Sequence, residues 1–363
     1  MTSKESRHAF ALTELAVVTT IAITLTIILI PTLNHTRNAG MNQVSIANLA
    51  AIGELGAQYA NDNNAAIYTF SWKAGIAYPD LKSGSTRTYN SDQEAASAQA
   101  QNILQRATGR ITGPTAILHP NQRLVHRRYS HLPLADYMGV KSIMSDMWVD
   151  PADSNLLDWR NNPLGYLEQN SNFPYANGIP LEAGYDDISS WTSTSIVQLW
   201  AFASSYQVVP AAWSQDSAPT YIPVGDTPHL FQSIGGTQVP LGGRTFFEVR
   251  APAHKVHLFE EFDREQPGSP YFAYDHAQPA KLMFDGAVNT LPSGLARSST
   301  SPADPHTPWT QHYLPLDTFP IPLDGLGSPT QLDMRYRWTR GGLQGIDYTA
   351  LLSPYRPNRA KHP

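Results

Sequence analysis

The sequence predicts an α+β protein in which a long N-terminal hydrophobic helix precedes a large, strand-rich globular head. Three observations lead to this prediction. Residues 10–33 form an apolar run with a single charged residue, Glu14. Apolar residues then recur at helical spacing as far as residue 62. From about residue 140 onward, short apolar runs alternate with clusters of Gly, Pro, Asn and Asp, a pattern typical of strands and turns.

The composition allows a sizeable folded core and excludes several classes of function. Hydrophobic residues make up 41% of the 363 residues and charged residues 15%, with a net charge of -5. No basic excess is present to neutralise phosphates, so nucleic acid is not expected as a partner. Cysteine is absent, which excludes disulfides, zinc–thiolate sites and cysteine nucleophiles.

Residues 1–9 form a short basic leader, with Lys4 and Arg7 ahead of the apolar run. A helix over residues 10–33 would be about 36 Å long, enough to cross a hydrocarbon core of about 30 Å. The basic flank predicts a cytoplasmic N-terminus and export of the remaining chain. A secretory signal would need a small-residue cleavage site after the run, and PTLNHTRNAG offers a poor one. A plain single-pass anchor fits the length, but neither interpretation explains why a carboxylate, Glu14, stands inside an apolar segment.

The string AFALTELAVVTTIAITLTIILIP resembles the N-terminal signature of type IV pilins and type II secretion pseudopilins. The resemblance implies cleavage by a prepilin peptidase between Ala9 and Phe10, with methylation of the new N-terminus. It makes Glu14 the fifth residue of the mature chain and Pro31 the twenty-second, where pilins commonly carry a helix-kinking proline. One departure is that the family usually has glycine where Ala9 stands.

This resemblance also implies partners and a location. The chain would wait in the bacterial inner membrane, join other pilin or pseudopilin subunits at the assembly platform, and enter a periplasmic or cell-surface filament. Glu14 would pair with the N-terminal amine of a neighbouring subunit, which would offset the desolvation of the buried carboxylate.

Residues 34–62 predict an amphipathic continuation of the same helix, bent at Pro31 and ending near 61–64, where NDNN favours a turn. Two apolar faces are expected, so that the helix can pack on the head with one face and on neighbouring helices with the other. The first face consists of Val44, Ala51, Ile52, Leu55 and Tyr59. The second face, of smaller residues, consists of Ile46, Leu49, Gly53, Gly56 and Ala60. An ordinary amphipathic helix is the alternative. The stretch NLAAIGELGAQYANDNN also resembles the segment that follows the signature in large pilin-like proteins.

The exported head covers residues 63–363, with a possible subdomain break near 165–180. A helix is predicted over residues 91–110, opening at a Ser/Asp cap and ending at Gly109. The best strand candidates are TSIVQLWAF (194–202), GRTFFEVR (243–250), HKVHLFEEF (254–262), AKLMFDGAV (280–288) and MRYRWTR (334–340).

The segment DHAQPAKLMFDGAVNTL resembles the C-terminal region of the same pilin-like group, in which a histidine precedes a strand that ends in Asp-Gly. His276, Asp285 and Gly286 occupy those places. Asp-Gly after a hydrophobic run predicts a β-hairpin, a structural role that we prefer over a catalytic His276–Asp285 pair.

Two groups of residues have the composition of metal ligands. Asp150, Asp153, Asn155 and Asp158 place four oxygen donors within nine residues and could hold calcium, although a capped turn fits them equally well. His254 and His257 precede Glu260 and Glu261. A strand would direct the two histidines to opposite faces, which argues against zinc. No other cofactor is expected.

The function expected from these patterns is a structural filament subunit and not an enzyme. No GxSxG, HExxH or phosphate-binding glycine loop is present. The alternative is an exported, single-pass membrane-anchored carbohydrate-binding protein or enzyme. In that case tryptophans could stack on sugars, although such residues more often form cores: Trp148, Trp159, Trp191, Trp200, Trp213 and Trp338.

Overall fold

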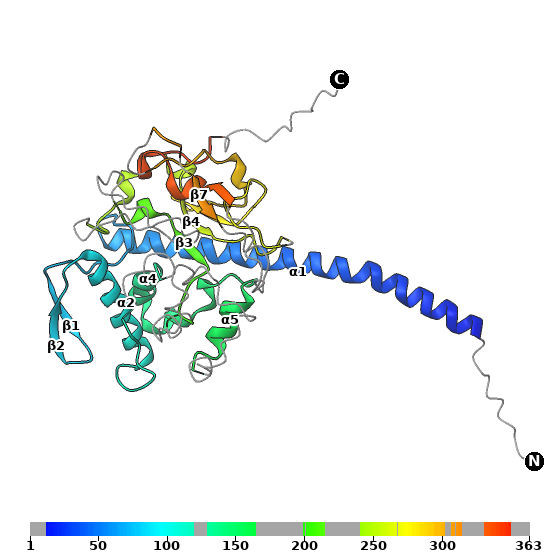
Figure 1. Ribbon diagram of the computed structural model, residues 1–363, viewed down its shortest axis with the longest axis horizontal. Coiled ribbons are helices and arrows are strands. Elements are labelled where there is room, and N and C mark those ends of the chain that lie inside the picture. The colour runs from blue at the N-terminus through cyan, green and yellow to red at the C-terminus, as the bar shows by residue number, and fades with distance from the viewer. Residues whose placement is uncertain are drawn as a thin grey trace, which may run out of the picture.

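The computed structural model describes residues 12–119, 129–164, 199, 201–214, 240–266, 268–301, 306–308, 310–313 and 330–349. A long helix, α1, runs into a head that is built around the C-terminal part of this helix (Figure 1). Helices and antiparallel sheets both contribute to the head, so the predicted α+β class is confirmed. The predicted break near 165–180 lies outside the described residues.

Helix α1 (Leu12–Asp62) is continuous over 51 residues, including the position of Pro31. It ends where the chain reverses through Asn64 and Ala65, both of which have positive φ. The amide of Ala65 donates to the carbonyl of Ala60 at 2.7 Å, which closes the final turn. Within the part of the chain that the structure describes, no helix combines the length and hydropathy that crossing a membrane requires.

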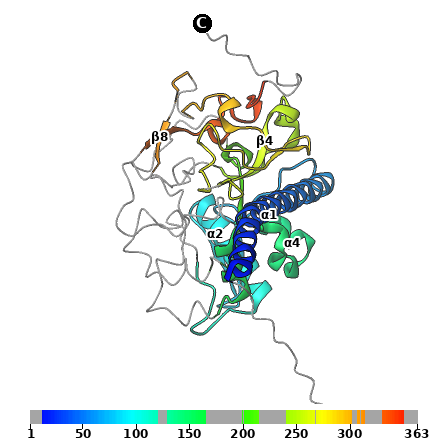
Figure 2. The same ribbon diagram turned by 90° about the vertical axis from the view of Figure 1, so that its right-hand side faces the viewer.

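One side of α1 carries the helical part of the head and a small hairpin (Figures 1 and 2). The hairpin joins β1 (Ala77–Asp80) to β2 (Ser85–Thr88), and the helices are α2 (Asp92–Thr108), α4 (Leu132–Met138) and α5 (Ser154–Asn161). Helix α2 matches the predicted helix: the Ser91 side chain accepts from the Glu94 amide, and Gly109 ends the helix in the left-handed conformation.

The other side of α1 carries an antiparallel sheet in the order β3-β4-β5-β6. Its strands are β3 (Tyr206–Val208), β4 (Val256–Glu260), β5 (Lys281–Met283) and β6 (Val288–Asn289). Every residue of β3, β4 and β5 is buried, because both faces of these strands are covered. A second sheet pairs β7 (Thr310–Tyr313) with β8 (Thr330–Asp333).

Short 3-10 helices link these elements: η1 (Val140–Met144), η2 (Asp146–Trp148), η6 (Pro210–Ala212), η7 (Phe246–Glu248), η8 (Pro252–His254), η9 (Ser293–Leu295), η10 (Arg335–Trp338) and η11 (Gly342–Gln344).

Two strand predictions are correct and two are wrong. The run 254–262 contains β4, and the run 280–288 contains β5, the following turn and the first residue of β6. The runs 243–250 and 334–340 instead form η7 and η10. In the first, the Thr245 amide donates to Glu248 Oε1 at 2.7 Å, and this capping interaction bends the chain. In the second, Arg335 has a φ of 46°, which is incompatible with an extended strand. The run 194–202 falls mostly outside the described residues.

Aromatic side chains are the largest fully buried residues of the core in the part of the chain that the structure describes. Trp148, Trp159, Trp213 and Trp338 are all buried, which is the core role expected for tryptophans rather than a sugar-stacking surface. Trp191 and Trp200 lie outside the described residues.

Candidate functional site

Helix α1 has an outer part that stands clear of the head and an inner part that is packed into it (Figure 1). The inner part begins at Asn38, whose side-chain amide donates to the backbone carbonyl of Glu265 at 2.9 Å. One buried stripe then follows at steps of three and four residues: Ser45, Leu49, Ile52, Gly56 and Ala60. This stripe combines members of both apolar faces expected from the sequence, whereas Val44 remains 49% exposed.

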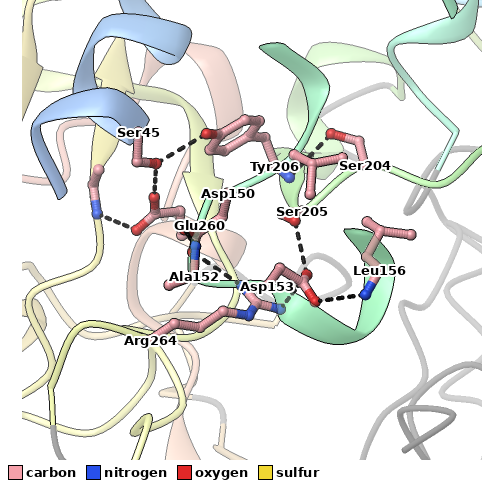
Figure 3. Close-up of polar contacts among 12 residues, drawn as sticks. Ser45, Asp150, Ala152, Asp153, Leu156, Ser204, Ser205, Tyr206, Glu260 and Arg264 are labelled. Atoms are coloured by element: carbon pink, nitrogen blue, oxygen red, sulfur yellow. Dashed lines mark hydrogen bonds and ion pairs between the residues drawn. The ribbon is translucent and has the colours of Figure 1, made fainter. Parts of the chain in front are cut away.

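Ser45 is the polar member of that stripe and fastens α1 to the sheet (Figure 3). Its hydroxyl donates to Glu260 Oε1 on β4 and is also hydrogen-bonded to the hydroxyl of Tyr206 on β3, at 2.9 Å. One turn later, the side-chain amide of Asn48 donates to the carbonyl of Val149 at 3.2 Å. A polar junction therefore ties the helix to both sides of the head.

Glu260 is the central acid of this junction. Its second oxygen, Oε2, accepts from the amide of Ala280 at 2.8 Å. Burial raises the pKa of the Glu260 carboxyl well above its ordinary value, and the nearby charges of Asp150 and Glu265 raise it further. The folded state therefore favours the protonated, neutral form of the Glu260 carboxyl.

Three carboxyl groups converge at the junction: Asp150, Glu260 and Glu265, which we call the acidic cluster. One oxygen from each lies within 4.8 Å of the others. Burial raises the pKa of Asp150 to about 6 and that of Glu265 to about 8. The cluster therefore holds protons near neutral pH. Converging carboxylate oxygens are also the donors that a hard cation such as Ca²⁺ prefers, so the same three groups could hold a metal.

Arg264 supplies positive charge beside the acidic cluster (Figure 3). Its Nη1 lies 3.5 Å from Asp150 Oδ2, and its Nη2 lies 2.9 Å from Asp153 Oδ2. All three side chains are mostly or completely buried, with exposed side-chain fractions of 10% or less. A buried guanidinium between two carboxylates offsets part of their desolvation, so removing it would leave uncompensated negative charge.

The four residues expected to bind calcium do not converge as a set. Asp150 and Asp153 meet on Arg264, and Asp153 also accepts from the Leu156 amide as the N-cap of α5. Asp158 is exposed in α5, and Asn155 belongs to the same helix, with a side chain outside the described set. The oxygen donors that gather around Asp150 come instead from Glu260 and Glu265. The sequence signal for Glu260 was a charged residue within an otherwise apolar strand.

The two histidines considered as zinc ligands, His254 and His257, contact other groups in the structure. His254 lies in η8, where its Nδ1 is 2.8 Å from the carbonyl oxygen of Tyr348. His257 is buried in β4 and stacks on the ring of Phe284 at 4.3 Å. Burial lowers the pKa of His257 to about 3, and the nearby charge of Lys255 lowers it further, so this imidazole is neutral in the fold.

The Asp-Gly pair forms the turn of the β5–β6 hairpin. Asp285 Oδ1 accepts from the Ala287 amide at 3.0 Å, and Gly286 has a φ of 91°, a conformation that favours glycine. His276 is exposed at the opposite end of β5, beside the ring of Tyr274. The two ends of the motif are thus separated by the strand.

The N-terminal residues singled out by the sequence lie at or beyond the limit of what is described. Ala9 and Phe10 are outside the described residues. Glu14 and Pro31 are part of the helical backbone of α1, and their side chains are not among those described. Comparisons with protein-family models, curated proteins and solved structures give no match.

Proposed function

We propose that this chain is a structural subunit of a type IV pilus-like or type II secretion pseudopilus-like filament, and that it performs no chemistry itself. The observation that carries the proposal is the outer part of α1, residues 12–37, which projects from the head toward the viewer in Figure 2. Twenty-six helical residues measure about 39 Å. The prepilin-like register of Ala9, Phe10, Glu14 and Pro31 falls on or just before this projection.

The projecting helix exposes more apolar surface than an isolated soluble monomer normally does. The large apolar side chains that the structure describes in this segment are between 50% and 62% exposed: Val17, Val18, Ile21, Ile23, Leu29, Ile30 and Leu33. Exposure of this many apolar side chains marks an interaction site. Equivalent helices of neighbouring subunits would cover it in a filament core.

The threonines of the projection are suited to an apolar environment. The hydroxyls of Thr24, Thr32 and Thr36 donate to backbone carbonyls three or four residues earlier, at 2.8, 2.8 and 2.9 Å. A hydroxyl that is already hydrogen-bonded within its own helix needs no water, so its burial costs less. These residues therefore favour burial of this helix among apolar neighbours.

The polar junction fits the same role. A pulling force on the head of an assembled subunit would act on the contacts between the head and α1. The hydrogen bonds of Ser45 to Glu260 and of Asn48 to Val149 are among these contacts. Processing by a prepilin peptidase, storage in the inner membrane and delivery to an assembly platform complete the proposal. In a filament core, Glu14 would pair with the α-amine of Phe10 of a neighbouring subunit.

Intact-mass and N-terminal peptide analysis of protein from its native membrane tests the processing step. We expect a mature chain that starts at N-methylated Phe10. An intact start at Met1 or Thr2, or a cut beyond Pro31, would overturn the filament proposal. Either result would favour the alternative, a membrane-anchored carbohydrate-binding protein or enzyme.

Substitution of the assembly carboxylate tests the filament itself. Glu14→Ala should reduce the filament fraction recovered by shearing at least tenfold, while cleavage before Phe10 and folding of the head persist. Glu54→Ala is the matched control, because Glu54 is an exposed glutamate on the inner part of α1. Normal assembly of Glu14→Ala would show that this carboxylate has no part in subunit contacts.

A further inference from the structure

A cavity of about 510 Å³ opens on the head where three segments of the chain meet. One segment ends at Arg250, the second covers residues 297–300, and the third is the turn 340–346 around η11. The second and third segments are the orange and red parts of the ribbon above α1 in Figure 1. This volume is within the range of pockets that take small-molecule ligands.

The charge of this cavity has one sign. Arg250, Arg297 and Arg340 line it, and every other lining residue is uncharged. All three arginines are exposed, and no carboxylate among the described residues lies within ion-pair distance of them. We call this cavity the arginine pocket. Three exposed guanidinium groups are a strong local concentration of positive charge in a chain whose net charge is -5.

One arginine is already oriented by a neighbour. Arg340 Nη2 lies 3.2 Å from Nδ1 of His306. A guanidinium has donors and no acceptor, so Nδ1 of His306 accepts this hydrogen bond. The remaining donors of Arg340 stay available to a ligand, and the positive charge is not cancelled.

Backbone hydrogen bonds hold the three segments together. The amide of Arg250 donates to the carbonyl of Leu343 at 3.4 Å, and the amide of Arg297 donates to the carbonyl of Asp347 at 2.8 Å. Asp347 is itself anchored by Lys255 at 3.1 Å, in an ion pair whose side chains are each 1% exposed. These contacts fix the backbone positions of the segments that carry the arginines, which lowers the entropic cost of binding a ligand.

The close turn over residues 340–346 requires glycine at position 345. A Cβ at this position would lie 2.2 Å from the carbonyl oxygen of Arg340 and 2.6 Å from Cγ2 of Thr339. Any larger residue would force the turn apart and displace Arg340. The local sequence TRGGLQG therefore brings the third arginine to the pocket.

We infer that the arginine pocket binds a small anion that carries two or more phosphate or carboxylate groups. The planar fork of arginine matches both of these groups with paired hydrogen bonds, and one monovalent anion could not neutralise three guanidinium groups. The uncharged rim of Ser298, Thr300 and Gln344 can donate further hydrogen bonds. This inference does not depend on filament assembly, since the pocket belongs to the head.

Calorimetric titration of the full-length chain in mild detergent at low salt tests the inference. Inorganic pyrophosphate and citrate are the two probes, one for phosphate and one for carboxylate chemistry. We expect saturable binding of at least one probe at millimolar concentration or tighter, weakened by added salt because the contacts are ionic. The tighter probe identifies the chemical class of the natural ligand.

Variants locate the binding. Arg297→Gln and Arg340→Gln should each weaken binding about tenfold or more, as expected for the loss of a charge-assisted hydrogen-bonded contact. Arg87→Gln is the matched control, since Arg87 is an exposed arginine on β2. Thermal melts of each variant verify that the head is folded. No saturable binding of either probe, or equal affinity in Arg297→Gln, Arg340→Gln and the parent chain, would overturn the inference.

Discussion

Glu260 gives a direct test of the polar junction formed by Ser45, Asn48 and Glu260. Because the fold favours its protonated form, Glu260→Gln and Glu260→Ala should change the stability of the chain differently. In the fold, the raised pKa favours the protonated carboxyl, whereas the unfolded chain loses this proton above the ordinary glutamate pKa. The folded state therefore binds more protons than the unfolded state, and the stability of the parent chain falls as pH rises above the ordinary glutamate value. Glutamine imitates the neutral acid and does not titrate.

The expected magnitude follows from the linkage relation. Between the ordinary pKa of 4.5 and the raised pKa of the folded state, the cost of protonating Glu260 on folding grows by about 1.4 kcal/mol per pH unit. Glu260→Gln should thus match the parent chain within about 1 kcal/mol at pH 4.5 and gain stability relative to it at up to about 1.4 kcal/mol per pH unit above that pH. Its amide nitrogen can donate to Ser45, while its oxygen accepts from Ala280.

Glu260→Ala is the companion variant. It leaves the Ala280 amide and the Ser45 hydroxyl without their acceptor and opens a cavity. At pH 4.5, where protonation costs little, this loss should be about 2–5 kcal/mol.

Urea unfolding of the full-length chain in detergent, followed by tryptophan fluorescence and near-ultraviolet circular dichroism from pH 4.5 to 7.5, measures both effects. A stability difference between Glu260→Gln and the parent chain that does not change with pH would contradict a raised pKa of Glu260. Equal destabilisation by Glu260→Gln and Glu260→Ala at pH 4.5 would contradict it as well, because Glu260 would then be ionised in the fold.

Two further predictions concern other buried groups. The neutral imidazole of His257 has its pKa lowered from 6.5 to about 3, so the unfolded chain binds the extra proton and stability is lost as pH falls below 6.5. His257→Phe should remove about 2 kcal/mol of the loss between pH 6.5 and 5, measured as a smaller shift of the urea midpoint, and an unchanged pH dependence would contradict this assignment. Asp347→Asn should cost about 3–5 kcal/mol, because it leaves Lys255 charged and buried. Asp285→Asn, at an exposed turn, is its control, and equal melting temperatures for the two variants would refute the buried ion pair as a stabilising contact.

Predictions from the sequence were most accurate where the determining contacts are local. Ser91 and Gly109 define the ends of α2 through hydrogen bonds to residues three or four positions away. Asp285 and Gly286 form a hairpin turn for the same reason. Strand candidates in irregular segments were less reliable, because the apolar pattern around Phe246 is also compatible with a capped 3-10 turn.

The sequence by itself determined the extent of the long helix and the local turns, since each depends on neighbours within a few residues or on the polarity of one segment. Tertiary structure alone decided which acids meet. Asp150 and Glu260 lie on segments far apart in the chain, and only the packing of the head around α1 brings their carboxyl groups together. The arginine pocket arises in the same way, from three separate segments. Burial, and with it the shift of each pKa, is a property of what surrounds a side chain, and the sequence of its own segment does not contain that information.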